Sequence, residues 1–163
     1  MRTLHVVSRA LMITAVAFVA SCGYSTDVYA PSQESPLKIN EVFPNGDIPG
    51  GWVEIFNPTA YDIDMGGWRV TAGDVSRSFM VPAGAVIPAQ GFLAVNEGNF
   101  PLGLKSADAV HLFSPSGVEV DSFSWTVNPA TSYGRCADGS GQFVVTTTAT
   151  RKSANDCPTP GAG

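Results

Sequence analysis

The chain has 163 residues, of which 44% are hydrophobic and 14% charged, and its nine Lys or Arg and fourteen Asp or Glu give a formal charge of −5. This length allows one domain of ordinary size. The acidic balance, with no cluster of basic residues, makes nucleic acid an unlikely partner, because a negatively charged protein is repelled by phosphate backbones.

The N-terminal segment has the pattern of an export signal. Arg2 and Arg9 make its start positive, and "ALMITAVAFV" at residues 10–19 is an uncharged apolar run. Such a run is shorter than the roughly 20 residues that span a bilayer and has the length of a signal-peptide core. Removal of this segment leaves seven basic and fourteen acidic residues, a formal charge of −7.

The end of this signal resembles the lipobox of bacterial lipoproteins. "VASC" at residues 19–22 places a branched apolar residue and two small residues before a cysteine. The resemblance implies that residues 1–21 are a lipoprotein signal peptide and that Cys22 is lipidated, which anchors the chain to a membrane. The alternative is ordinary cleavage after "VYA" at residues 28–30, well past the apolar run. Gly23, rather than an aspartate, favours the outer membrane if the source is Gram-negative.

Polar, proline-containing segments are expected on both sides of the domain. "GYSTDVYAPSQESP" at residues 23–36 has no sustained apolar period, so residues 22–36 are interpreted as the lipidated cysteine and a flexible tether. "PTPGAG" at residues 158–163 is expected to be a disordered tail. The folded domain is therefore assigned to residues 37–157.

The two remaining cysteines are predicted to form a disulfide. Cys136 and Cys157 would lie in an oxidising compartment after export, and their bridge would close a loop of about 20 residues. A metal site is the alternative, but the exported chain offers it one histidine, His111, and no third available thiol.

The remaining sequence consists of short apolar-alternating runs separated by Gly, Pro, Asn and Asp, without an amphipathic window long enough for a helix. This pattern predicts an all-β antiparallel sandwich. Its strands are expected at residues 37–43, 52–57, 67–72, 78–81, 92–96, 109–114, 118–125, 132–135 and 142–145.

One expected strand, "WVEIFN" at residues 52–57, carries a glutamate between apolar neighbours. Alternation places Val53 and Ile55 on one face and Trp52, Glu54 and Phe56 on the other. The sequence therefore predicts Glu54 to be an outward strand residue without a catalytic role.

Several of these motifs together resemble the bacterial exported branch of the lamin-tail domain family. They are "INEV" at 39–42, "WVEIFNPT" at 52–59, "IDMGGWRV" at 63–70, "IPAQGFLAV" at 87–95, "SADAVHLFSPSGVEVDSFSW" at 106–125 and "SYGRCADGSGQFV" at 132–144. The resemblance implies an immunoglobulin-like β-sandwich and a binding or tethering module. It transfers no catalytic residue, because the family shares none.

Two kinds of chemical site can be imagined from the residues. Asp108 and His111 with a serine would supply a hydrolytic triad, but no "GxSxG" elbow is present and His111 is expected in a half-exposed strand. "DIDMG" at residues 62–66 partly resembles a calcium loop but lacks its distal glutamate, so solvated charges are preferred. We expect no catalytic residue, no cofactor and no metal.

Trp52, Trp68 and Trp125 are candidates for a binding surface, with the alternative that these rings cap the core, which is preferred for at least two of them. The function expected from the sequence is that of a non-catalytic, lipid-anchored module that binds or scaffolds an unknown protein or polysaccharide of the cell envelope. The alternatives are an accessory targeting module for a separately encoded secreted hydrolase or nuclease, and a glycan-binding module.

Overall fold

The computed structural model describes residues 35–44, 50–96 and 102–159. The predicted signal peptide, the lipidation site at Cys22, nearly all of the tether and the last four residues lie outside these ranges. In the described ranges, no helix has the length and apolar character needed to cross a membrane.

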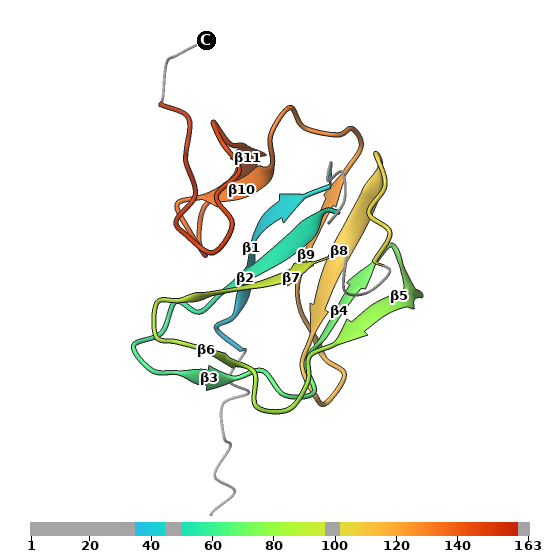
Figure 1. The fold of residues 1–163 in the computed structure, drawn as a ribbon, viewed down its shortest axis with the longest axis vertical. Coiled ribbons are helices and arrows are strands. Elements are labelled where there is room, and N and C mark those ends of the chain that lie inside the picture. Colours follow the sequence, from blue (N-terminus) through green and yellow to red (C-terminus); the bar gives the residue numbers. More distant parts are fainter. Residues whose placement is uncertain (1–34, 45–49, 97–101, 160–163) are drawn as a thin grey trace, which may run out of the picture. The chain divides into compact units, whose positions relative to one another are not determined.

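The described residues form two antiparallel sheets and a small ribbon (Figure 1). The larger sheet has the order β11-β10-β1-β2-β7, the second has the order β5-β4-β8-β9, and β3 pairs with β6. In chain order the strands are β1 (Lys38–Phe43), β2 (Trp52–Phe56), β3 (Ile63–Asp64), β4 (Arg69–Ala72), β5 (Asp74–Met80), β6 (Val86–Ile87), β7 (Phe92–Asn96), β8 (Asp108–Phe113), β9 (Glu119–Trp125), β10 (Tyr133–Cys136) and β11 (Gln142–Val145). The chain is an immunoglobulin-like β-sandwich, which confirms the predicted fold class.

Each of the nine predicted strands is present, with end points that differ by a few residues. The strand β5 begins four residues earlier than predicted, at Asp74. The strands β3 and β6 were not predicted, because each has only two residues and alternation cannot be recognised over so short a run.

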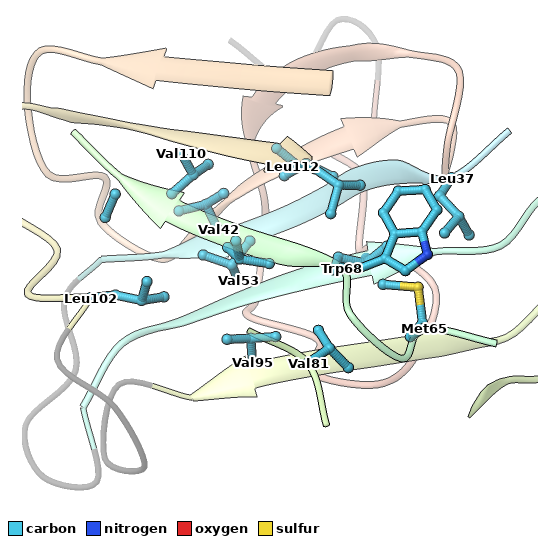
Figure 2. Close-up of a cluster of buried hydrophobic side chains, with 14 of the residues drawn as sticks. Leu37, Val42, Val53, Met65, Trp68, Val81, Val95, Leu102, Val110 and Leu112 are labelled. Carbon is cyan, nitrogen blue, oxygen red and sulfur yellow. The ribbon is translucent and has the colours of Figure 1, made fainter. Parts of the chain in front are cut away.

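The core lies between the two sheets and follows from the alternation of apolar side chains. Val53 and Ile55 of β2 face inward, as do Val110 and Leu112 of β8, and none of the four is exposed. Figure 2 shows this cluster, in which side chains from both sheets lie together. Full burial of each such side chain stabilises the fold by about 1.5–3 kcal/mol.

An ion pair joins the two sheets beside the start of β1. The Ile39 N–H donates to Asp121 Oδ2 at 2.9 Å, and Arg135 Nε donates to the Ile39 carbonyl at 2.8 Å. Arg135 Nη2 also lies 3.0 Å from each oxygen of Asp121. Because Asp121 belongs to β9 and Arg135 to β10, this clamp connects the second sheet to the first and satisfies both backbone groups of Ile39.

Substitution Asp121→Asn is expected to lower the free energy of unfolding by about 2 kcal/mol, because Arg135 would lose its charged partner at a site where both side chains are largely buried. Urea denaturation measures the change. Glu119→Gln on the same strand is the matched control: its side chain is 44% exposed, so the expected change is about 0.5 kcal/mol or less. Equal stability of the two variants would contradict the role of the clamp.

Candidate functional site

The C-terminal segment of residues 147–157, called the strap here, covers the outer face of the larger sheet. The Thr150 N–H donates to Glu41 at 3.1 Å and 3.2 Å, and the Lys152 N–H donates to Glu54. At its end the strap is joined to β10 by the disulfide Cys136–Cys157, which confirms the predicted pairing.

Glu54 lies on the face of β2 opposite the core, as predicted, but the expected outward position is wrong, because this side chain has no exposed surface. Its alternation was read correctly, because Val53 and Ile55 face the core while Trp52 and Phe56 share the face of Glu54. That second face is covered by the strap, so Glu54 has no exposed surface and all five residues of β2 are buried.

Two carboxylates therefore lie side by side beneath the strap. Glu41 and Glu54 are directly opposite each other across β1 and β2, and both are fully buried. Glu41 accepts hydrogen bonds from the hydroxyls of Ser132 and Thr150, the latter at 2.9 Å. Buried carboxylates are tolerated only when donors satisfy their oxygens, so these bonds tie the strap to the sheet.

Asn40 occupies an irregular position of β1 and links the same region to the β10–β11 turn. The register between β1 and β2 shifts between Ile39 and Glu41. The Asn40 amide donates to Glu54 at 3.3 Å and to Asp138 at 2.9 Å, and its oxygen accepts from Gly139 N–H at 2.9 Å. A β-bulge re-aims a side chain in this way.

Two glycines let the backbone pack closely at this face. A Cβ on Gly134 would lie 2.7 Å from Thr146 Cγ2 and 2.8 Å from Asn155 Cγ. Gly139 has a φ of +66°, and a Cβ there would lie 2.6 Å from Phe56 Cδ1. Gly134 is therefore a sequence signal for the covering strap, through Asn155, and Gly139 lets the β10–β11 turn pack on Phe56.

Burial raises the pKa of Glu54 to about 7. The hydrogen bonds from the Lys152 N–H and Asn40 oppose this rise, and the negative charges of Glu41 and Asp138 add to it. Burial likewise raises the pKa of Glu41, although Ser132 and Thr150 donate to it. The folded protein therefore binds protons at this face more tightly than an unfolded chain does.

This shift predicts that the protein becomes less stable between about pH 4.5 and pH 7. The folded pKa of Glu54 lies above its ordinary value of 4.5, so its contribution is fully present below pH 4.5 and is lost as the pH rises through about 7. The expected loss is on the order of 3 kcal/mol. Denaturation curves at several pH values measure it.

Glu54→Gln should at least halve this loss, because a neutral amide stands in for the protonated acid while Glu41 still titrates. Asp62→Asn, at an exposed carboxylate whose Oδ1 contact with the Ala89 N–H an amide can keep, is the control and should keep the wild-type pH profile. An unchanged slope in Glu54→Gln would contradict the assignment.

Replacement of both bridging cysteines by serine is expected to lower the free energy of unfolding by about 3 kcal/mol, since the bridge closes a loop of 21 residues. The amide hydrogens of Thr150 and Lys152, which bind the buried carboxylates, should then exchange faster with solvent. Chemical denaturation and amide exchange measure the two effects. Unchanged exchange at these amides would mean that the strap stays closed without the bridge.

The residues considered for a hydrolytic triad are separated by the pleat of β8. Asp108 and His111 are three apart in this strand and therefore point to opposite faces. Asp108 forms a bidentate ion pair with Arg77, in which Nη1 donates to Oδ2 and Nη2 donates to Oδ1, each at 2.9 Å. Burial opposes its ionisation, but the hydrogen bonds and the charge of Arg77 outweigh it and lower the pKa of Asp108. His111 Nδ1 lies 3.3 Å from Glu119 Oε2.

The prediction of an aromatic binding surface is wrong, because all three tryptophans are buried. Trp52, Trp68 and Trp125 are 6%, 7% and 5% exposed. Trp68 belongs to the core, and Trp125 donates its Nε1–H to the Lys105 carbonyl at 3.0 Å. Trp52 stacks on Phe43 with ring centres 5.9 Å apart. The buried positions agree with the alternative, in which these rings cap the core.

The aspartates of the segment considered for calcium bind backbone groups. Asp62 Oδ1 accepts from the Ala89 N–H at 3.0 Å, and Asp64 Oδ1 accepts from the Gly66 N–H at 2.8 Å. Over the ranges that the structure describes, no three His, Cys, Asp or Glu side chains are grouped as metal ligands.

An apolar groove of about 330 Å³ opens at the seam between the edge strands β5 and β7. Its volume is at the lower end of the roughly 300–1,000 Å³ of typical ligand pockets. The groove is lined by Phe79, Val81, Pro82, Ala85, Leu93, Ala94, Val95 and Asn96, none of which carries a charge. The sequence analysis missed it, because it arises where two strands distant in sequence border the same opening.

The structure is therefore an immunoglobulin-like domain in which the strap covers a polar sheet face and an apolar groove opens between β5 and β7. The family model described as Lamin Tail Domain matches residues 30–127, more than half of the chain, and the chain belongs to this family. No curated protein shows a significant match to it. The strands β10 and β11, which complete the larger sheet, and the strap follow the matched region.

Proposed function

We propose that this protein is a non-catalytic binding module anchored to the bacterial cell envelope. One contrast carries the proposal. The side chains considered for a hydrolytic triad are kept apart, because Asp108 pairs with Arg77 and His111 points to the opposite face of β8. An uncharged groove, in contrast, remains open at the seam of the sandwich. Uncharged, concave surfaces favour binding over proton transfer.

The anchor in this proposal is an acyl-modified Cys22, supported by "VASC" behind the apolar run. Residues 22–36 then act as a tether that holds the domain away from the lipid surface, in the outer membrane if the organism is Gram-negative. The proposal also places the chain in the exported bacterial branch of the family, since a lipid anchor requires export.

Among possible partners, a protein of the envelope is preferred to a polysaccharide. The three tryptophans considered for sugar binding are buried, so the observation that favoured a polysaccharide is removed. Nucleic acid is disfavoured by the formal charge of −7 that remains without the signal segment.

Mild cross-linking in the native envelope, followed by pull-down and mass spectrometry, tests the proposal. The lipidated chain should retain a reproducible envelope protein, and Cys22→Ser, which removes the acylated thiol, should lose both membrane fractionation and that partner. Retention of polysaccharide alone, or unchanged membrane fractionation of Cys22→Ser, would contradict the proposed role.

A further inference from the structure

The core of the sandwich is incompletely covered at the β5–β7 seam. Val81 and Val95 lie next to each other there, as Figure 2 shows, and each is 2% exposed. Phe79 and Leu93 pack against the same core but are only partly buried, and both line the groove. The groove is therefore an extension of the core that no strand covers within the described residues.

The edge of β7 beside the groove presents backbone groups without strand partners. The Asn57 N–H donates to the Gly91 carbonyl at 3.0 Å, and the register continues without interruption to the pairs of Ile55 with Leu93 and Val53 with Val95. Hydrogen-bonded pairs alternate along an antiparallel ladder. The N–H and C=O groups of residues 94 and 96 thus point away from β2.

No described strand occupies that side, because β7 is the last strand of its sheet. An unpaired strand edge is a template for another strand, and natural edges are usually protected by charges, prolines or bulges. The strand β7, "FLAVN", contains none of these, and its ladder with β2 has no register shift.

We propose that this edge binds an extended peptide segment of a partner protein, which adds as a further strand beside β7. Alternate side chains of the segment enter the groove, so they are uncharged and aliphatic, and the residues between them are polar. This inference rests on the proposed binding function and names the chemistry of its partner.

The groove and the edge together favour a peptide strand over another apolar ligand. An acyl chain could fill the groove but would leave the backbone groups of Ala94 and Asn96 unused. A strand uses both surfaces, since its backbone pairs with the edge and its alternate side chains enter the pocket.

The test uses the full chain in detergent micelles and a phage-displayed library of random nine-residue peptides. Selected peptides should carry aliphatic residues at every second position. We expect the Ala94 amide to exchange fast in the free protein and slowly with bound peptide, and the amides of Leu93 and Val95, which face β2, to be protected in both states.

Two variants address the two halves of the inference. Ala94→Pro removes the outward N–H and is compatible with an edge strand, and Ala85→Glu places a charge in the groove. Each should weaken peptide binding by about tenfold or more. The matched control Ala94→Ser keeps the N–H and should bind like the wild type. Thermal melting checks that each variant is folded, and Ala85→Glu carries the test if Ala94→Pro is not.

The inference is overturned if no peptide is selected above a control protein, if selected peptides lack the alternation, or if folded Ala94→Pro and Ala85→Glu bind them as well as the wild type does. An envelope partner that both variants retain would leave the binding function standing and remove the strand inference. Alternating peptides without any envelope partner would confirm the strand site and refute the envelope role.

Discussion

Two buried carboxylates, Glu41 and Glu54, impose the main constraint on this domain. They face each other across β1 and β2 and would repel one another without donors around them. The strap supplies those donors from its own backbone, through Thr150 and Lys152. The disulfide fixes the end of the strap, so the outer face of the larger sheet, the bulge in β1 and the C-terminal segment form one polar unit. On the opposite face of the larger sheet, the apolar core follows from the alternation of apolar side chains alone.

The features that depend on local pattern could be predicted from the sequence. Period-two alternation located nine strands, and its inward set, such as Val53 and Ile55, is the observed core. The disulfide followed from a count of the remaining cysteines and an oxidising compartment. Each of these inferences uses only neighbouring residues or composition, and tertiary contacts did not alter them.

The features that depend on what covers a face could not be predicted in this way. Alternation says that Glu54 lies opposite the core, but only the path of the strap decides whether that side meets water. Trp52 shares this face, and its burial likewise depends on a tertiary neighbour, Phe43. Gly134 and Gly139 recorded the close approach of the backbone, yet a glycine between strands is equally consistent with a turn. The groove at the seam depends on the pairing order of sheets, which local periodicity does not encode.

The clamp of Asp121 and Arg135 at Ile39 has a mechanical consequence. With the anchor at Cys22 that we propose, a pull between the membrane and a partner would enter the domain at the start of β1. There the β10 ladder has not yet begun, since its register starts at Glu41 with Gly134. The clamp holds the free side of Ile39 while β2 holds the other. Such a load would meet the ladder with β2 at Lys38 and, one residue later, the charge-assisted clamp to β9 and β10, so it would be shared between both sheets.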